Sequence, residues 1–429
     1  MAFAAAALSG LAACTKLTLA WTDLGPNGAE ATPPALAAFD GFGPATDAAA
    51  WRERIPALRS ALEAHVYGVM PERSDTGVLE RKILNARAFG GKGVLEELRI
   101  VASATFGGET IATRETLGAQ GFVMNVAAPK GAAEPVPVIL METFCPRFAT
   151  LRDPANAPPA NYRGPGSGEG FFGGLETYVF GRYICTPPVE AILDAGYAIA
   201  TIYPDEIVPD RAAEGLAELR RLSAGHADDE TRWGAIAAWA WLYSRMVDAL
   251  EEDPRFDKSA FIAWGHSRYA KSALVAAAWD ERIDGAIAHQ SGTGGASLNR
   301  DKPGESIREM TENYPHWFSP AYTEFAGREN DMPVDQHQLL ALIAPRPVLL
   351  GNARRDVWSD PNGAFRAAMG ADPVYELLGA RGLTTDRLDR FDPSAELSFW
   401  IRPGTHGVVE EDWPAFLEFL DAHFQDVMR

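Results

Sequence analysis

Residues 260–274 read A-F-I-A-W-G-H-S-R-Y-A-K-S-A-L. An apolar, strand-like run passes through Gly265 and Ser267 and continues into a segment with a helical pattern. A serine on a sharp turn between a strand and a helix can present its hydroxyl as a nucleophile, usually within the motif G-x-S-x-G. Here Tyr269 stands where the second glycine belongs. Because a lone G-x-S is common by chance, the surrounding sequence must decide whether this turn is a catalytic elbow.

Continuous apolar runs like this one recur along the chain. Strands that are buried on both faces of a parallel sheet have this composition. The predicted strands are 136–141, 198–203, 261–264, 285–288, 348–351 and 397–401. Between them lie segments with apolar residues at helical spacing, most clearly 233–251, 269–279 and 362–369. Strands that alternate with helices predict a three-layer α/β-hydrolase sandwich, with a mostly parallel sheet covered by helices on both faces.

The N-terminal part of the chain has a different pattern. Residues 24–50 are rich in Pro, Ala and Gly and are interpreted as a linker or arm. Residues 51–70 carry apolar residues at helical spacing, and this helix should end near Gly68. Residues 78–126 include alternating stretches that are typical of antiparallel strands. We therefore expect one domain over 51–429, with a helix and strands added on its N-terminal side.

Ser267 needs a general base, and the base needs a carboxylate that orients it. In α/β-hydrolases the chain order is serine, acid, histidine, and the last two lie in loops after later strands. Asp356 and His406 each follow a predicted strand, and His406 precedes a final helical pattern. Of the eight histidines, only His406 and His423 come after Asp356, and His423 lies near the end of that last pattern. The order therefore predicts a Ser267–His406–Asp356 triad.

The composition limits the class of protein and its partners. The chain has 429 residues, of which 47% are hydrophobic, and its formal net charge is -19. Such an acidic surface repels nucleic acid and anionic membranes, so we expect neither as a partner. No internal stretch is long enough for a membrane-spanning helix. No H-E-x-x-H, paired C-x-x-C or phosphate-binding glycine loop is present, so we expect no metal and no cofactor, and we expect a monomer.

The cysteines and the N-terminal segment bear on the compartment. Cys14, Cys145 and Cys185 fit no metal spacing and leave a Cys145–Cys185 bridge open. Residues 1–23 contain Leu11-Ala12-Ala13-Cys14 within a mostly small, apolar segment, which resembles an incomplete signal with a bacterial lipobox. The basic residues that open a signal peptide are missing, so a plain apolar tail is the alternative. We predict a secreted or periplasmic protein. In one form of this prediction, the exported protein is anchored by a lipid on Cys14.

The stretch around Ser267 resembles the elbow of the glucuronoyl esterases, carbohydrate esterase family 15, whose pattern is G-[CH]-S-R-x-[GA]-K. The resemblance extends over about 65–410, which is most of the chain. The other segments that carry it are 67–71, 233–241, 291–296, 315–318, 335–337, 344–347 and 356–361. It implies a serine esterase that cleaves the ester between 4-O-methyl-glucuronic acid on xylan and an alcohol of lignin.

The same resemblance implies roles for four residues. An arginine directly after the serine helps to stabilise the oxyanion in this family, which implies that role for Arg268. The family's lysine, one helical turn after the serine, contacts hydroxyls of the glucuronoyl ring, which implies that role for Lys271. Trp358 and Glu305 match the sugar-contacting tryptophan and glutamate. Other interpretations stay open, namely a solvated helix lysine, a packing tryptophan and a loop carboxylate.

One position departs from the family pattern. Many members carry the catalytic acid as a glutamate after the strand that follows the elbow, and this chain has Gln290 there. A neutral amide cannot stabilise an imidazolium by charge, so the acid is expected at Asp356, with Asp360 as a weaker substitute. The loop 142–146 also differs beside the oxyanion hole. These departures leave two other functions open. The chain could be an esterase for acetylated xylan or small carboxylic esters, or a non-catalytic carbohydrate-binding protein.

Overall fold

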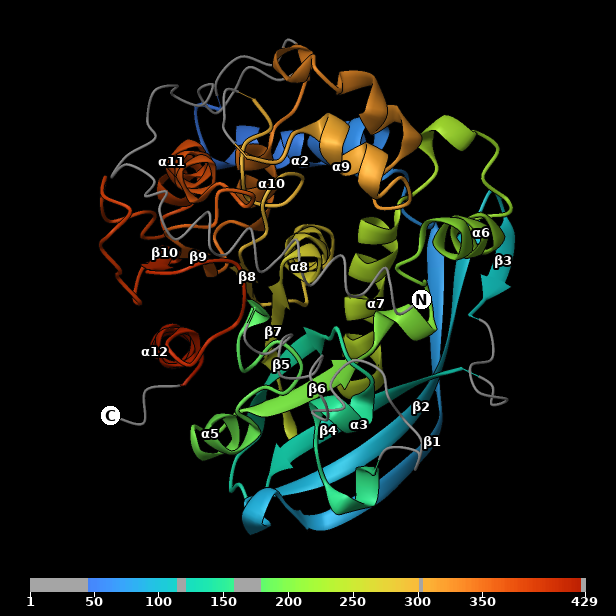
Figure 1. Cartoon of the computed structure of the whole chain (residues 1–429), viewed down its shortest axis with the longest axis vertical. Coiled ribbons are helices and arrows are strands. Elements are labelled where there is room, and N and C mark those ends of the chain that lie inside the picture. Colours follow the sequence, from blue (N-terminus) through green and yellow to red (C-terminus); the bar gives the residue numbers. More distant parts are fainter. Residues whose placement is uncertain (1–44, 114–120, 158–178, 301–303, 426–429) are drawn as a thin grey trace.

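A ten-stranded sheet forms the centre of the molecule (Figure 1). The computed structural model describes residues 45–113, 121–157, 179–300 and 304–425, so the segment with Cys14 lies outside the described residues. The strand order is β1-β2-β4-β6-β5-β7-β8-β9-β10, and β3 pairs with β2. The strands are β1 Arg73–Ala88, β2 Gly93–Phe106, β3 Glu109–Ala112, β4 Phe122–Pro129, β5 Val136–Glu142, β6 Ala198–Ile202, β7 Phe256–His266, β8 Gly285–His289, β9 Val348–Ala353 and β10 Leu397–Arg402.

The sheet has an antiparallel part and a parallel part. Strands β1 to β4 pair in antiparallel fashion, and β4 also lies antiparallel to β6. From β6 through β5, β7, β8 and β9 to β10 every pairing is parallel. The antiparallel strands come from the N-terminal segment and the parallel ones from the alternating part of the chain. The antiparallel strands predicted within residues 78–126 are therefore present.

Helices cover both faces of this sheet. Along β5, Val138 and Leu140 belong to one apolar cluster, whereas Ile139 and Met141 belong to a second one on the opposite face. Successive side chains of a strand point to opposite faces, so a strand with two apolar faces requires cover on both sides. The first cluster includes side chains of α2 Ala48–Leu62, α6 Ala212–Leu222, α7 Ala235–Leu250, α8 Arg268–Trp279, α9 Ile307–Asn313, α10 Gln336–Ile343 and α11 Pro361–Leu377. The second includes those of α5 Val189–Asp194 and α12 Asp412–Phe424. The predicted three-layer α/β sandwich is confirmed.

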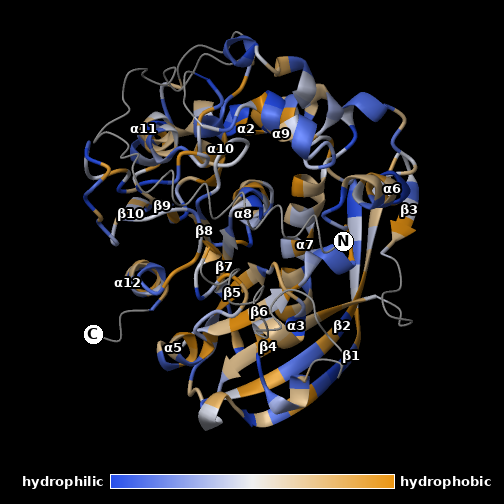
Figure 2. Cartoon of the chain, viewed as in Figure 1, coloured by the Kyte–Doolittle hydropathy of each residue, from blue (hydrophilic) through white to orange (hydrophobic). Residues whose placement is uncertain are grey.

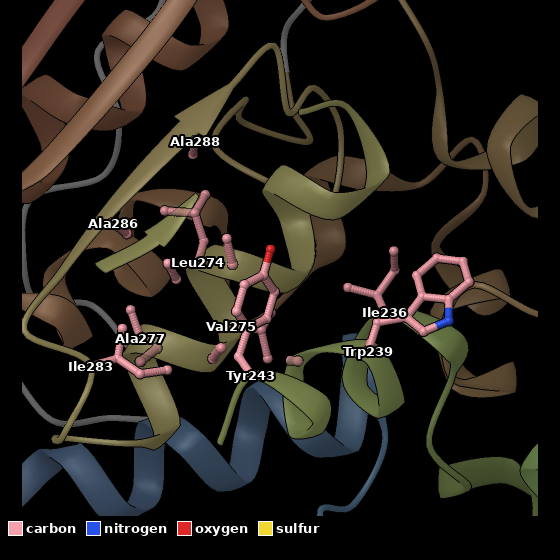
Figure 3. Packing of buried hydrophobic residues seen from close by; sticks show 14 of the residues in the cluster. Ile236, Trp239, Tyr243, Leu274, Val275, Ala277, Ile283, Ala286 and Ala288 are labelled. Atoms are coloured by element: carbon pink, nitrogen blue, oxygen red, sulfur yellow. The ribbon is translucent and has the colours of Figure 1, made fainter. Parts of the chain in front are cut away.

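Helices α7 and α8 pack together beside the sheet and fix the position of the predicted elbow. Figure 3 shows Ile236, Trp239 and Tyr243 of α7 close to Leu274 and Val275 of α8. All five side chains are fully buried. The Tyr243 hydroxyl donates a hydrogen bond of 2.8 Å to the carbonyl oxygen of Trp264 in β7. Helix α7 therefore contacts both the strand before Ser267 and the helix after it, which fixes them relative to each other.

The N-terminal helix begins slightly earlier than the sequence pattern indicates. Helix α2 starts at Ala48 because the Asp47 side chain accepts hydrogen bonds from the backbone N–H groups of Ala49 and Ala50. A π-helical turn, Glu63–Tyr67, follows it and ends at Gly68. Gly68 has φ 84°, and a Cβ atom there would lie 2.3 Å from the Cα of Trp233. Only glycine fits this close approach, which confirms the predicted end of the helix.

The distribution of apolar residues follows this architecture. Figure 2 shows hydrophobic residues concentrated on the inner strands, while the peripheral loops are mostly hydrophilic. Within the described ranges, no helix combines the length and the apolar character needed to cross a membrane.

Candidate active site

Ser267 sits on a strained turn between β7 and α8. Its backbone angles are φ 56° and ψ -122°, a conformation that non-glycine residues rarely adopt. The Ser267 N–H donates to the carbonyl oxygen of His289 at the end of β8, 2.9 Å away. Strain that the surrounding structure maintains is typical of functional turns, and a nucleophile elbow has this geometry.

The first glycine of the motif is required here and the second is not. A Cβ atom on Gly265 would lie 1.9 Å from the carbonyl oxygen of Tyr269, so the backbone of the elbow leaves no room for it. The Tyr269 side chain is buried and packs against Phe144 and Trp239, with ring centroids 4.7 and 5.3 Å away. The buried Ala270 follows it. Tyr269 therefore fills space beside the elbow instead of closing it.

His406 and Asp356 lie together at the carboxyl ends of β10 and β9. His406 Nδ1 lies 2.7 Å from Asp356 Oδ2, and Asp356 is almost fully buried. An ionised carboxylate can only accept, so Nδ1 carries the proton of this hydrogen bond. The His406 ring lies 4.7 Å, centroid to centroid, from the ring of His266, the residue before Ser267. Within the described residues Ser267 Oγ and His406 make no direct hydrogen bond, as is common in free enzymes before substrate tightens the site.

Asp356 stays ionised despite its burial. Burial by itself would raise the pKa of Asp356, but the charge of protonated His406 lowers it, as do hydrogen bonds from His406 and Ser359. The net effect is a pKa below the ordinary aspartate value. A carboxylate that favours the charged imidazole in this way suits the acid position of a triad.

Gln290 is a neutral amide that hydrogen-bonds to the loop carrying His406, and it does not act as an acid. It follows β8 with φ 54°, and its side chain is almost fully buried. Its Oε1 accepts from the N–H of Gly407 at 2.8 Å, and its Nε2 donates to the carbonyl oxygen of Thr405 at 3.4 Å. These two backbone groups flank His406. An amide makes both bonds because it carries a donor and an acceptor, whereas an ionised carboxylate would lose the donor.

Arg402 and Asp412 also hold the loop that carries His406 in place, and no sequence pattern predicts these contacts. Arg402 Nη2 donates to the carbonyl oxygens of Thr405 and Gly407, at 3.2 and 2.7 Å. Its Nε donates to Asp412 Oδ1 at 2.8 Å, and both side chains are buried. Asp412 also accepts from the N–H of Val409 at 2.7 Å. The loop that carries His406 is thus fixed from both sides. A charged pair ten positions apart, as these two are, is too common in sequences to indicate this role.

Arg268 begins α8, directly after Ser267. Its backbone N–H is in the first turn of the helix, where amides lack an intrahelical acceptor. Its guanidinium forms an ion pair with Asp210 and lies over the rings of Phe144 and Trp317, 5.3 and 5.1 Å from their centroids. Phe144 belongs to the loop after β5, which in α/β-hydrolases supplies the second oxyanion donor. The structure therefore places Arg268 beside the elbow and next to that loop.

The three predicted sugar-contacting residues are linked through one loop. Lys271, buried in α8, directs its ammonium group to the carbonyl oxygens of Ser291 and Thr293, at 2.5 and 2.6 Å. The Thr293 hydroxyl donates to the backbone carbonyl of Glu305 at 2.6 Å, and the Glu305 N–H donates to that of Trp358 at 3.4 Å. Lys271 is thus no solvated helix lysine. Trp358 is 49% exposed and is no packing residue either.

Two hollows flank this arrangement. One of about 330 Å³ lies beside His406 and is lined also by Arg355 and by the histidine loop. The other, of about 460 Å³, lies beside Glu305 and has mainly polar lining residues. The structure thus offers space next to His406 and next to Glu305.

The cysteines lie close to the same loops. Cys145 and Cys185 form a disulfide, which joins the loop after β5 to the segment before α5. The bridge that the sequence left open is therefore present. Among the described residues, no cluster of three or more His, Cys, Asp or Glu side chains is arranged to hold a metal ion.

Comparisons with known proteins identify relatives of this chain. The family model described as glucuronyl esterase of fungi matches residues 226–379. The carbohydrate esterase MZ0003, from an unknown prokaryotic organism, is 31% identical over 388 residues, covering 88% of this chain and 86% of the relative. A 4-O-methyl-glucuronoyl methylesterase 1 of Wolfiporia cocos (strain MD-104) is 33% identical over 154 residues, covering 34% of this chain and 38% of the relative.

Solved structures extend the likeness to nearly the whole chain. The glucuronoyl esterase from Solibacter usitatus has a TM-score of 0.75 and 34% identity, covering 91% of this chain and 98% of that one. A promiscuous esterase of the same family from a marine bacterial metagenome has a TM-score of 0.75 and 29% identity, covering 92% and 97%. The fold, the extent of these matches and the elbow sequence agree. The chain therefore belongs to the glucuronoyl esterases, carbohydrate esterase family 15.

Proposed function

We propose that this carboxylic ester hydrolase cleaves esters of 4-O-methyl-glucuronic acid, with Ser267 as nucleophile, His406 as general base and Asp356 as the acid of the triad. The observation that carries the proposal is the Asp356–His406 pair, 2.7 Å apart, next to the strained elbow of Ser267. The substrate class comes from relatives named 4-O-methyl-glucuronoyl methylesterases. The natural bond would be the ester between glucuronoxylan and an alcohol of lignin.

The reaction follows from the positions of the protons. With Nδ1–H held by Asp356, His406 Nε2 is free to take the proton of Ser267 as its oxygen attacks the ester carbonyl. The backbone N–H of Arg268 and its guanidinium stabilise the resulting oxyanion. The intermediate collapses and His406 gives its proton to the leaving alcohol. Water then attacks the acyl-enzyme with His406 again as base, which releases the glucuronic acid and restores Ser267.

Lys271, Glu305 and Trp358 are proposed to hold the sugar. The Lys271 ammonium lies at the glycine-rich loop between the elbow helix and Glu305, where ring hydroxyls of the acyl group would be within reach. The exposed Trp358 ring offers a flat apolar face to a pyranose. A neutral ester also tolerates the acidic surface of the protein better than a free uronate does.

Trp358→Ala should weaken binding of the sugar without disturbing the fold. Because half of the side chain is exposed, little packing is lost, and we expect KM for a glucuronate ester to rise by about 5- to 20-fold, since tenfold corresponds to ~1.4 kcal/mol. Turnover of an aryl acetate, which has no pyranose, should change by less than about twofold. Leu79→Ala on β1, where Leu79 is 50% exposed, is the matched control. Equal loss on both substrates would argue against a sugar contact.

Steady-state kinetics on three esters test the substrate class. We expect kcat/KM for benzyl glucuronate to exceed that for an aryl acetate and for acetylated xylan by at least about 10-fold. Ser267→Ala provides the background rate for each. If acetylated xylan or the aryl acetate were the better substrate, the protein would be an acetylxylan or general carboxylesterase. No turnover of any ester above the Ser267→Ala background would support a binding protein without catalysis.

The disulfide supports a location outside the cytoplasm. Disulfides persist in oxidising compartments such as the periplasm and the extracellular space, and are rare in the cytosol. Cys145 and Cys185 are both buried next to Ala149, which is the environment of a structural bridge. We therefore propose that the protein is secreted or periplasmic. Fractionation of the producing cells tests this, since recovery in the cytosol with free thiols would contradict it.

A further inference from the structure

We propose that Asp210 is a positioning residue that holds the Arg268 guanidinium in place for the oxyanion, an inference that rests on the proposed function. Asp210 lies in the loop after β6, far from the elbow in sequence, and forms an ion pair with Arg268. Arg268 side-chain exposure is 26% and that of Asp210 is 13%, so the pair is largely shielded from solvent. In such a pair the geometry is well defined and screening is weak.

The Asp210 carboxylate is itself held by two donors. Trp317 Nε1–H donates to Asp210 Oδ1 at 2.7 Å, and His316 Nε2 lies 2.9 Å from the same oxygen. Oδ2 is thereby left to pair with Arg268. Oδ1 therefore fixes the orientation of the carboxylate, and Oδ2 pairs with the guanidinium. Because the carboxylate is held in one orientation, it also limits the orientations of the guanidinium.

His316 acts in this group as a neutral donor. Burial lowers the pKa of His316 to about 4, and the nearby charge of Arg268 lowers it as well. Above that pH the ring carries one proton, which Nε2 donates to Asp210, while Nδ1 is buried without a partner among the described residues. The negative charge of Asp210 is therefore balanced by Arg268 and not by the histidine.

The frame around these donors is rigid. The N–H groups of Ala235 and Ile236, at the start of α7, donate to the carbonyl oxygens of His316 and Trp317 at 2.8 and 3.0 Å. The Trp317 ring stacks on Tyr314 with a centroid distance of 3.8 Å and an angle of 6°. Arg268 therefore receives its orientation from a fixed platform on the layer of α7 and α8.

Two effects of Asp210 on the reaction oppose each other. A carboxylate near the developing oxyanion repels it, so removal of the charge alone should raise kcat. A guanidinium without its partner, however, samples many rotamers and must be ordered during the reaction, which lowers kcat. The Arg268 side chain keeps 26% of its surface exposed, which leaves the guanidinium room to reorient once its partner is lost, so we expect the loss of orientation to dominate. The sign of the change in kcat therefore distinguishes positioning from simple electrostatics.

Asp210→Asn in the full chain tests the inference. We expect kcat for a glucuronate ester to fall by about 10- to 100-fold, with KM within about threefold. Arg268→Ala should cost about 100- to 1000-fold, as removal of an oxyanion donor does elsewhere. Since Asp210 acts only through Arg268, adding Asp210→Asn to Arg268→Ala should cause less than about a twofold further change. A wild-type or raised kcat in Asp210→Asn, or an additive loss in the double variant, would overturn the inference.

A milder variant keeps the test decisive if Asp210→Asn does not fold. Trp317→Phe removes the indole N–H that holds Asp210 and retains an aromatic ring over Arg268, so kcat should fall by about 3- to 10-fold. An unchanged kcat in this variant would contradict the inference. The variants also distinguish a failure of the proposed oxyanion role of Arg268 from a failure of the positioning role of Asp210. If Arg268→Ala keeps wild-type kcat, the proposed oxyanion role fails. If Arg268→Ala is impaired and Asp210→Asn and Trp317→Phe are not, only the positioning role fails.

Discussion

Ser267→Ala should reduce kcat for a glucuronate ester by about 10⁶-fold. Loss of the nucleophile removes the covalent route, and in serine hydrolases of this kind the single change costs about as much as removal of the whole triad. Residual hydrolysis would come from the oxyanion site and from binding alone. The fold should persist, because alanine carries the same Cβ atom on the strained turn as serine does. The measurement is kcat on benzyl glucuronate, with thermal unfolding as a check.

A serine in the strand that precedes the elbow gives the control for this variant. Ser259 lies in β7, is exposed and bonds to Asp257 at the surface. Ser259→Ala should leave kcat within about twofold of wild type. Near-wild-type turnover by Ser267→Ala would mean that another residue is the nucleophile, and the proposed mechanism would be wrong.

Asp356→Asn should reduce kcat by about 10⁴-fold. The amide leaves the size of the side chain unchanged, but it holds His406 in the wrong tautomer and cannot stabilise the imidazolium by charge. No second carboxylate compensates within the triad, because Gln290 is neutral and its side chain is engaged with the backbone on both sides of His406. KM should change by less than about threefold, since Asp356 is buried beneath the histidine.

Asp360→Asn is the matched control for the acid. Asp360 is a buried aspartate in the same loop, and its side chain accepts from the N–H of Gly363 at the start of α11. Asparagine is an equally good residue at that position, so stability should change little and kcat should stay within about threefold. A large loss in Asp360→Asn, together with turnover within tenfold of wild type in Asp356→Asn, would reverse the assignment of the acid.

The positions of the three residues of the proposed triad could be predicted because strand ends are readable from the sequence. The apolar runs that became β7 and β9 are buried on both faces and that of β10 is largely buried, and Ser267, Asp356 and His406 each follow one of them. Carboxyl ends of parallel strands meet at one edge of a sheet, so order along the chain was enough to bring His406 and Asp356 together. The absence of the second glycine of G-x-S-x-G does not prevent the elbow from forming, because the Tyr269 side chain packs beside the turn.

The contacts that hold the site residues in position could not be predicted from the sequence. The brace that Gln290 forms depends on the conformation of the loop after β10, which no periodicity encodes. Asp210 reaches Arg268 because β6 lies beside β5 in the sheet, and strand order is not visible in a single sequence. The burial of Lys271 against loop carbonyls depends in turn on the path of the chain after β8. These contacts arise from tertiary arrangement alone.

Mass spectrometry after reaction with a fluorophosphonate probe tests the central claim most directly, because the probe modifies only serines that an adjacent base activates. We expect the wild-type protein to gain one adduct, located on Ser267 by peptide mapping. Labelling should be strongly slowed in Asp356→Asn and should be absent in Ser267→Ala. An unlabelled wild-type protein, or an adduct on a different serine, would contradict the account.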